Sequence, residues 1–210
     1  MQNMPRSIRP GWRALALGLG LAVAALVAAT PGAIAGGTIT GLTPAKPQPK
    51  PAALKPGLAV TYYYGMVRHV DELATIAKYS KGNVGPPIPQ LNYKVGQGNV
   101  LTSKFNNGVG AFIEGLINFA QAGTYVLKMQ SNDGVKLEIG GKLIHLDPGV
   151  HVDTFSDPIP VKIDEAGWYP LSLIYFERKA TSTLELYWSQ PGGAEASDFV
   201  PADAFAHLPK

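Results

Sequence analysis

Short apolar segments separated by glycine-containing turns dominate the chain from residue 57 onward. They are rich in Val, Ile, Leu, Tyr and Phe and recur about every 8 to 12 residues, a spacing typical of a β-sandwich or barrel. In the last segment, Leu184, Leu186 and Trp188 alternate with Glu185 and Tyr187, which indicates one buried and one wet face. The predicted strands cover residues 58–64, 111–119, 124–131, 135–139, 142–146, 158–163, 168–178 and 183–189.

Turns and one helical pattern complete the expected architecture. Gly140 and Gly141 suit a two-residue hairpin loop, and short turns of this kind imply antiparallel strands. Residues 70–79 carry apolar residues at helical spacing and predict one short surface helix, whereas the Gly- and Pro-containing residues 80–103 predict a long loop. The predicted fold class is therefore all-β, an antiparallel β-sandwich or barrel with long loops and at most one short helix.

The N-terminal residues have the composition of an export signal. Arg6, Arg9 and Arg13 precede the apolar residues 14–29, and small residues end the segment. This order predicts a signal peptide over residues 1–35, cleaved after Ala35. The alternative is a retained membrane anchor, because the apolar run is only slightly shorter than the roughly 20 residues that a bilayer requires. We expect an exported protein, periplasmic or extracellular, with no membrane span after cleavage.

Removal of the signal peptide also changes the charge of the chain. The whole sequence has a formal charge of +3 and a pI of about 9.0, from 18 basic and 15 acidic residues. Without the three signal-peptide arginines, 15 basic residues balance 15 acidic ones. A nucleic-acid partner is therefore not indicated. The chain has no cysteine, so its stability must come from an apolar core rather than from disulfides.

Residues 36–56 are rich in proline and lysine and poor in large apolar side chains. Such a composition predicts an extended, flexible leader, and the alternative is a positively charged docking strip. The predicted organisation is a signal peptide at residues 1–35, the leader at 36–56 and one β-sandwich domain at 57–210.

Several short motifs occur along this domain in a recognisable order. They lie at residues 57–63, 114–117, 122–125, 131–137, 140–142, 166–170, 175–177, 184–189 and 199–201. Together they resemble the protective-antigen-type (PA-fourteen) domain of bacterial toxins, glycosidases, surface adhesins and yeast flocculins. The resemblance implies a β-sandwich that is frequently a carbohydrate-binding lectin.

The resemblance also implies a site. Lectin members of the family hold one Ca²⁺ with two adjacent aspartates joined by a cis peptide, and the corresponding residues here are Asn132 and Asp133. Asparagine can still offer Ca²⁺ a carbonyl oxygen, but the lost charge lowers the expected affinity. Asn132 and Asp133 are thus the implied metal ligands, with Ca²⁺ as the candidate cofactor. The alternative for Asp133 is an Asx-type turn with Gly134.

A second lectin loop of the family would fall between Tyr175 and Thr183. With the first loop, it gives a ligand-binding set that comprises Asn132, Asp133, Gly134, Glu177, Arg178 and Thr181.

A further polar cluster has the composition of a metal site. His145, Asp147, His151 and Asp153 form two His-x-Asp pairs that suit a nitrogen and oxygen metal site, although a polar surface loop explains them as well. The sequence contains no recognisable nucleophile elbow, phosphate loop or dinucleotide fingerprint. We therefore expect no enzyme.

The predicted function is an exported, non-catalytic, lectin-like domain that binds a glycan or a cell-envelope polysaccharide, with calcium as a candidate aid. The alternative is a structural or assembly subunit of a cell-envelope or secreted complex that binds a protein partner.

Overall fold

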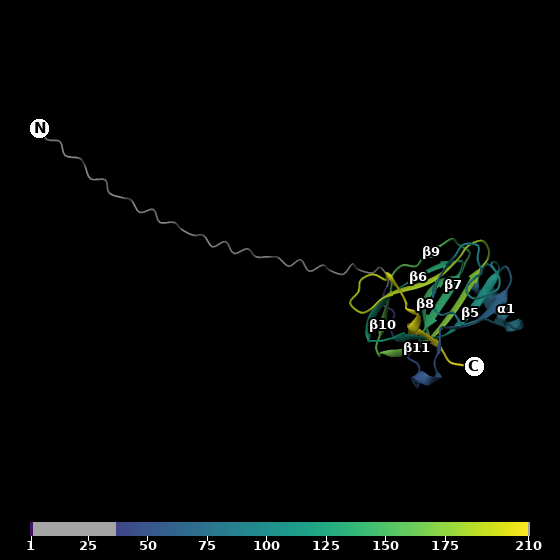
Figure 1. Cartoon of the computed structure of the whole chain (residues 1–210), viewed down its shortest axis with the longest axis horizontal. Helices are drawn as coiled ribbons and strands as arrows, with labels where there is room; N and C mark the ends of the chain where they lie inside the picture. The colour runs from purple at the N-terminus through teal and green to yellow at the C-terminus, as the bar shows by residue number, and fades with distance from the viewer. Residues whose placement is uncertain (2–36, 210) are drawn as a thin grey trace. The chain divides into compact units, whose positions relative to one another are not determined.

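Two antiparallel sheets packed face to face, with one short helix, make up the part of the chain that the structure describes (Figure 1). The structure is a computed structural model, and it describes residues 37–209 together with Met1. Apart from Met1, the predicted signal peptide at residues 1–35 lies outside the described residues. The elements are η1 (Pro51–Ala53), β1 (Lys55–Pro56), β2 (Ala59–Tyr64), α1 (Val70–Tyr79), β3 (Asn83–Val84), β4 (Asn92–Val95), β5 (Val109–Phe119), β6 (Gly123–Asn132), β7 (Val135–Ile139), β8 (Lys142–Asp147), β9 (Thr154–Phe155), β10 (Ile159–Ile163), β11 (Gly167–Glu177), β12 (Ser182–Ser189), β13 (Asp198–Phe199), η2 (Ala202–Ala204) and β14 (Phe205–His207).

Most neighbouring strands in the two sheets are not consecutive in the sequence. The larger sheet runs β1-β14-β5-β11-β7-β8, and β2 joins it by pairing with β5 and β3. The smaller sheet runs β10-β6-β12-β13, with β4 on β12 and β9 on β6. The smaller sheet therefore carries β6 and β12 at its centre, and the end of β6 leads into the predicted binding loop.

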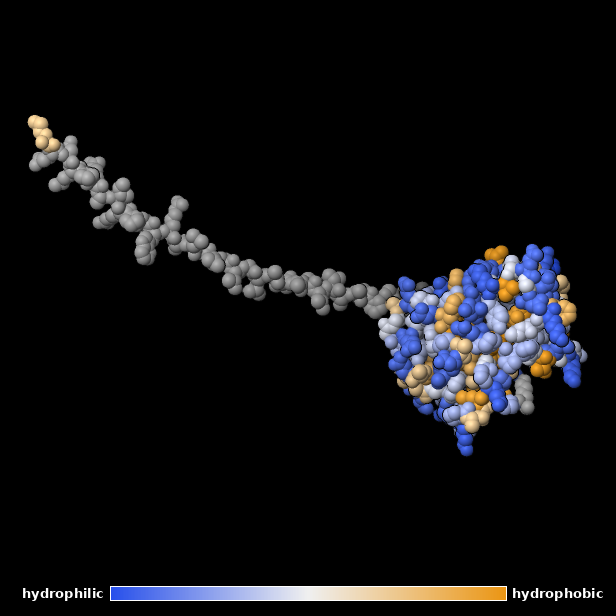
Figure 2. Space-filling view, viewed as in Figure 1, coloured by the Kyte–Doolittle hydropathy of each residue, from blue (hydrophilic) through white to orange (hydrophobic). Residues whose placement is uncertain are grey.

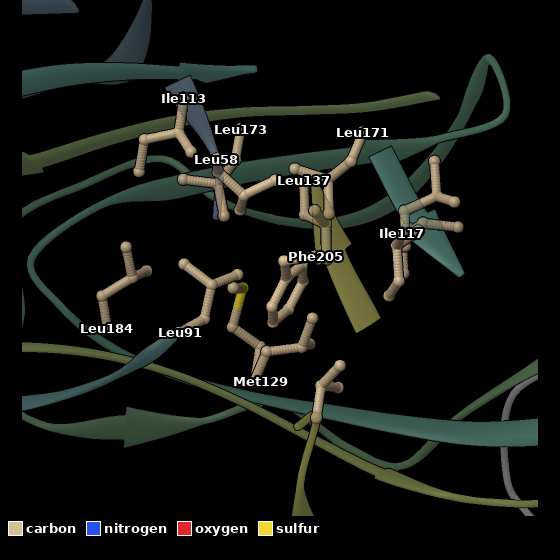
Figure 3. Close-up of a cluster of buried hydrophobic side chains, with 14 of the residues drawn as sticks. Leu58, Leu91, Ile113, Ile117, Met129, Leu137, Leu171, Leu173, Leu184 and Phe205 are labelled. Atoms are coloured by element: carbon tan, nitrogen blue, oxygen red, sulfur yellow. The ribbon is translucent and has the colours of Figure 1, made fainter. Parts of the chain in front are cut away.

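Alternation along the strands builds the core between the sheets. Tyr169, Leu171, Leu173 and Tyr175 of β11 are buried, while Ser172 between them is exposed. In β12 the predicted buried face is confirmed, because Leu184, Leu186 and Trp188 all belong to the core cluster. The predicted wet face is wrong at Glu185, which is only 5% exposed because β12 lies between β6 and β4. Figure 3 shows side chains of both sheets meeting, with Leu171 and Leu173 from one sheet and Met129 and Leu184 from the other. Burial of this apolar area supplies the main stabilisation of the fold.

The helix α1 covers part of the outer face of the larger sheet. Val70 and Leu73 form a second apolar cluster with Phe176 of β11. A Cβ atom on Gly110 would lie 2.3 Å from Leu73 Cδ1, so glycine at this position allows the helix to approach the sheet. Among the described residues, no helix is long and apolar enough to cross a membrane.

Hydrophilic residues cover much of the displayed face of the described domain, and hydrophobic ones are scattered among them (Figure 2). The all-β sandwich with one short helix is confirmed. The helix and β7 have the predicted bounds, and the other predicted strands agree to within about two residues. The predicted loop at residues 80–103 is wrong in one respect, because it contains β3 and β4, and β4 pairs with β12.

The leader at residues 36–56 does not extend freely from the domain as predicted. The N–H of Ile39 donates to the Pro160 carbonyl at 2.8 Å, and the N–H of Thr43 donates to the Gly140 carbonyl at 2.9 Å. Further along, β1 pairs with β14. Composition correctly indicates few backbone donors, but it does not reveal that sheet edges offer acceptors to the donors that remain.

The side chain of Gln48 connects the leader to the backbone of Trp168 by two hydrogen bonds. Its Nε2 donates to the Trp168 carbonyl at 3.0 Å, and its Oε1 accepts from the Trp168 N–H at 2.8 Å. We expect Gln48→Ala to raise the rate of limited proteolysis within residues 37–56 roughly 30-fold, since the two hydrogen bonds to Trp168, worth about 1 kcal/mol each, are lost. Substitution of the exposed Gln97 by alanine serves as the control. Equal cleavage of the leader in the wild type, Gln48→Ala and Gln97→Ala would contradict the docked arrangement.

Candidate functional site

The adjacent residues Asn132 and Asp133 stand at the end of β6 and face different surroundings. The peptide bond between them is cis. Asn132 pairs with Thr183 of β12, and its side chain lies at the edge of a hollow. Asp133 is directed to the inside and is only 3% exposed. Both residues are therefore buried, Asn132 at 7% and Asp133 at 3% exposed, but Asn132 borders the hollow whereas Asp133 faces the inside of the domain.

The carboxylate of Asp133 holds two loops that are distant in the sequence. Its Oδ1 accepts a hydrogen bond from the His151 N–H at 3.1 Å, and its Oδ2 accepts one from the Arg178 N–H at 2.8 Å. Burial raises the pKa of Asp133, and the two backbone donors oppose that shift. We call this arrangement the Asp133 clamp. It differs from a local Asx turn, because both donors come from other segments of the chain.

Gly134 and Tyr175 complete the packing around the clamp. A Cβ atom on Gly134 would lie 2.4 Å from Phe176 Cε1 and 2.9 Å from the carbonyl oxygens of Pro148 and Gly149. Only glycine fits where three segments approach so closely. Tyr175 Oη donates to the Asn132 carbonyl at 2.6 Å, which fixes the end of β6 from below.

Glu177 is fully buried beside the Asp133 clamp. Neither of its carboxylate oxygens has a hydrogen-bond partner among residues 37–209. Burial, with the nearby negative charge of Asp133, raises the pKa of Glu177 to about 7, and the N–H groups of Gly108 and Val109 oppose the shift. This side chain lies beneath the loops, so it is not available to a ligand on the surface.

A hollow of about 300 Å³, lined by both apolar and polar groups, opens beside Asn132 on the outer face of the smaller sheet. It is lined by Lys94, Val95, Gly96, Asn132, Val152, Asp153, Thr181 and Thr183. The register explains why β4, β6 and β12 all contribute, since Thr183 pairs with both Asn132 and Lys94 and directly opposed residues share a face.

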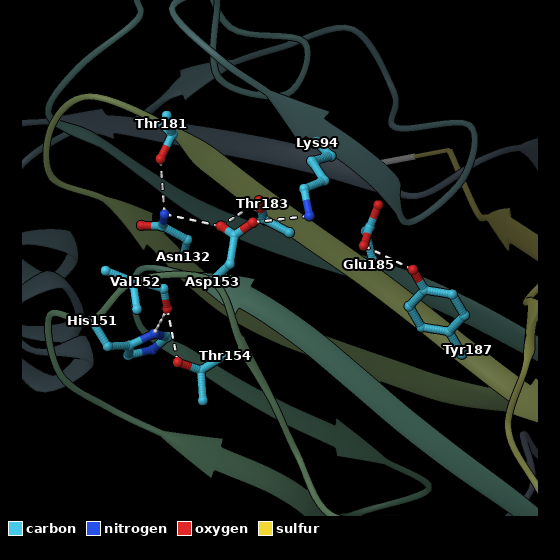
Figure 4. Close-up of polar contacts among 10 residues, drawn as sticks. All are labelled: Lys94, Asn132, His151, Val152, Asp153, Thr154, Thr181, Thr183, Glu185 and Tyr187. Atoms are coloured by element: carbon cyan, nitrogen blue, oxygen red, sulfur yellow. Dashed lines mark hydrogen bonds and ion pairs between the residues drawn. The ribbon is translucent and has the colours of Figure 1, made fainter.

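Asp153 is the centre of the network in this hollow (Figure 4). Its Oδ1 accepts from Asn132 Nδ2 at 3.0 Å and from Thr183 Oγ1 at 2.8 Å. Its Oδ2 lies 3.0 Å from the ammonium of Lys94. Asn132 Nδ2 also donates to Thr181 Oγ1 at 3.0 Å. Three side chains from three strands thus converge on one carboxylate, and Thr181 joins the network through Asn132.

The charges of the hollow are stabilised by each other. Burial tends to raise the pKa of Asp153, but hydrogen bonds from Asn132, Lys94 and Thr183 together lower it. The hydrogen bond and charge of Asp153 raise the pKa of Lys94. At neutral pH the hollow therefore presents a carboxylate, an ammonium and hydroxyl groups side by side. Hydroxyl groups of a ligand, which both donate and accept, find partners of each kind here.

The donor set does not fit calcium. Ca²⁺ takes six to eight oxygen ligands, among which carboxylates contribute the charge. The Asp133 carboxylate binds two backbone N–H groups inside the domain, and Asn132 directs its amide nitrogen toward Asp153. The ammonium of Lys94 already balances the charge of Asp153. The calcium pair implied by the resemblance is therefore not assembled as a cation site.

The two His-x-Asp pairs do not converge on a single point either. His151 Nε2 lies 3.3 Å from Asp147 Oδ2, whereas Asp153 belongs to the network with Asn132. Burial lowers the pKa of His145. Within the described part of the chain, no group of three or more His, Asp or Glu side chains is placed to hold a metal ion.

Of the six predicted site residues, Asn132 and Thr181 line the hollow. The other predicted residues, namely Asp133, Gly134, Glu177 and Arg178, lie at or under the loops that form it. Thr183, the end of the predicted second loop, also lines the hollow, whereas sequence reasoning did not assign Lys94 or Asp153 to this site. Lys94 belongs to the missed strand β4, and only the register of β4, β6 and β12 brings it to the same face as Asn132 and Thr183.

Comparison with known proteins agrees with this architecture. The PA14 domain family matches residues 98–199, and the chain carries a PA14 domain. No catalytic domain is matched. No curated protein matches the chain in sequence.

Several solved structures share the fold at low identity. The PA14 domain of the MpAFP antifreeze protein is 16% identical with a TM-score of 0.62, over 78% of this chain and 96% of that one. The PA14 sugar-binding domain from an RTX adhesin is 16% identical with a TM-score of 0.56, over 72% and 98%. The Epithelial Adhesin 9 A domain from Candida glabrata, in complex with Galb1-4GlcNAc, is 13% identical with a TM-score of 0.60, over 80% and 97%. At these identities the similarity establishes the fold.

Removal of the clamp should destabilise the domain. In Asp133→Ala two buried backbone N–H groups lose a charged acceptor worth about 1.5 to 3 kcal/mol each, so we expect the free energy of unfolding to fall by about 3 kcal/mol or more. For a domain of this size the melting temperature should drop by roughly 6 to 12 °C. Thermal denaturation followed by circular dichroism measures it, with the exposed Glu195→Ala as control. A loss below about 1 kcal/mol would contradict the clamp.

Glu177 should make the domain less stable as the pH rises. Its pKa is raised from 4.5 to about 7 in the folded state, so the folded state binds more protons between these values and loses stability as the pH rises through them. Glu177→Gln should therefore gain stability over the wild type by up to about 3 kcal/mol between pH 5 and pH 8. Urea denaturation across this range measures the difference. For the exposed control Glu165→Gln, the difference in unfolding free energy from the wild type should not change with pH. If the difference for Glu177→Gln did not change with pH either, the raised pKa of Glu177 would be refuted.

Proposed function

We propose that the protein is an exported, non-catalytic carbohydrate-binding domain that holds sugar hydroxyls in the hollow around Asp153 without calcium. The observation that carries this proposal is the charged network of Lys94, Asp153 and Asn132 at the wall of an open hollow. The sugar-binding PA14 domain of the RTX adhesin and the glycan complex of the Candida glabrata adhesin support the choice of ligand through their shared fold.

The chemistry of the hollow suits a neutral polyol. Asp153 accepts hydrogen bonds and Lys94 donates them, and such charge-assisted bonds are about twice as strong as neutral ones. The exposed Thr181 hydroxyl can do both. Val95 and Val152 line the same hollow and offer apolar contact to the C–H groups of a sugar ring. Hydroxyl groups that bridge the ammonium and the carboxylate would replace water without leaving either charge unpaired.

The absence of catalysis is part of the proposal. Glycoside hydrolysis generally uses two carboxyl groups that flank the scissile bond. Among the described residues that line the hollow, Asp153 is the one carboxylate, and it is held at a lowered pKa that suits an acceptor rather than a general acid. Export rests on the signal-like residues 1–35 of the sequence and would place the domain in the periplasm or outside the cell.

A second candidate function is docking of a protein partner in an assembly. The strand β8 is the last of its sheet, and Leu143 and Leu146 on it are 47% and 46% exposed. An open strand edge with apolar side chains can pair with a strand of another protein. This surface is separate from the hollow, so docking there would not depend on Asp153.

A glycan array followed by calorimetry on the purified protein tests the carbohydrate proposal. We expect binding to a defined set of neutral glycans that is unchanged by a calcium chelator. Asp153→Ala should weaken the best ligand at least tenfold, because the carboxylate acceptor is lost and Lys94 is left without its partner. Asp157→Ala, an exposed carboxylate in the same segment, is the matched control.

The possible results separate the candidates. Failure of the wild type to bind any sugar would refute carbohydrate binding and favour the protein partner. Binding that disappears in chelator would refute the metal-independent site, and unchanged affinity in Asp153→Ala would refute the location.

A further inference from the structure

The outer face of β12 continues beyond the hollow as a line of side chains. Thr183, Glu185 and Tyr187 alternate with the core residues Leu184 and Leu186, so they share the outer face, although Thr183 is only 1% and Glu185 only 5% exposed and Tyr187 is half-buried. At about 3.4 Å per residue, roughly 14 Å separates the first from the last. Figure 4 shows the Asp153 network, Glu185 and Tyr187 following one another along this strand.

Aromatic rings from three strands meet at the far end of this line. Tyr187 of β12 pairs with Phe199 of β13, and their rings stack with centroids 4.4 Å apart and planes 27° apart. On the other side, the ring of Phe155 in β9 lies 6.0 Å from that of Tyr187. Phe155 is 47% exposed. We call Phe155, Tyr187 and Phe199 the aromatic row.

Polar groups connect the aromatic row to the hollow. Tyr187 Oη donates to Glu185 Oε2 at 2.9 Å. Glu185 is paired in register with the exposed Asn92, and its charge acts on Lys94 at the edge of the hollow. Beside Phe155, the ammonium of Lys128 lies 4.2 Å from the ring centroid. Glu185 itself is only 5% exposed, so the accessible hydrogen-bonding groups between the two regions are the exposed side chains of Asn92 and Lys94 on the neighbouring strand β4.

We propose that this strip binds an extended glycan, with one sugar unit in the hollow and a following unit stacked on the aromatic row. The inference rests on the proposed function. Sugar rings have apolar C–H faces and polar edges, so a sugar chain needs alternating aromatic and hydrogen-bonding contacts. The strip offers both in one line, continuous with the Asp153 network. A protein partner on the same face would not require this alternation.

The experiment measures affinity against chain length. Homologous saccharides of one, two, three and four units, built from the sugar selected by the array, are titrated calorimetrically into the purified protein. We expect affinity to rise at least tenfold from one unit to the longer chains. Tyr187→Ala and Phe155→Ala should each remove most of that gain and leave the affinity for one unit unchanged. Asp153→Ala should weaken all lengths.

Two variants keep the result interpretable. Tyr187→Phe keeps the ring and loses only the hydrogen bond to Glu185, so it should retain the length gain. Tyr79→Ala removes an aromatic side chain that is 86% exposed elsewhere and should change nothing. Melting curves verify that each variant is folded. If Tyr187→Ala does not fold, Phe155→Ala still tests the aromatic row, because Phe155 is exposed.

The outcomes distinguish the two proposals. If saccharides of all lengths bound with equal affinity, and Asp153→Ala abolished binding of a single unit, the extended strip would be overturned. The proposal that the hollow binds a sugar would still stand. A length gain that persists in both Tyr187→Ala and Phe155→Ala would also overturn it. Failure to bind any sugar would refute the proposed function and with it the strip.

Discussion

The hollow around Asp153 depends on one buried carboxylate. Asp133 accepts hydrogen bonds from the backbone N–H groups of His151 and Arg178, residues 18 and 45 positions away in the sequence. Asp153 follows the first of these contacts and Thr181 follows the second, so both walls of the hollow are positioned from below. Because Asp133 is 3% exposed, water competes little for its oxygens. The His151 and Arg178 N–H groups therefore fix the position of the carboxylate.

The same part of the fold carries an electrostatic cost. Glu177 is buried beside Asp133 without a hydrogen-bond partner among the described residues, and two neighbouring carboxyl groups in a dry environment disfavour full ionisation. The outer network has the opposite character, since Lys94 and Asp153 neutralise each other at the surface. The unfavourable pair of buried carboxyl groups and the neutralised ion pair of the hollow thus lie on opposite sides of the backbone at the end of β6. Asn132 belongs to the ion-pair side and Asp133 to the buried side.

The sequence predicts what depends on local periodicity and misses what depends on long-range pairing. The alternation of Leu184, Leu186 and Trp188 and the helical spacing of Val70 and Leu73 identify their elements, because burial on one face leaves a regular pattern. The strand β4 and the docked leader leave no such pattern, since their partners are distant sheet edges. The family resemblance points to the loop after β6, but the carboxylate in the hollow is Asp153, whose place depends on the pairing of β9 with β6 and on the Asp133 clamp.

The Asp133 clamp also bears on how a ligand would be selected. Loops that are already held in place lose little conformational entropy on binding, so affinity is not reduced by an ordering step. A pre-organised wall adapts poorly, however, and a sugar whose hydroxyl points the wrong way would leave Asp153 or Lys94 desolvated without a partner. Discrimination between epimers would then arise from the rigidity of the backbone beneath the hollow rather than from the number of contacts within it.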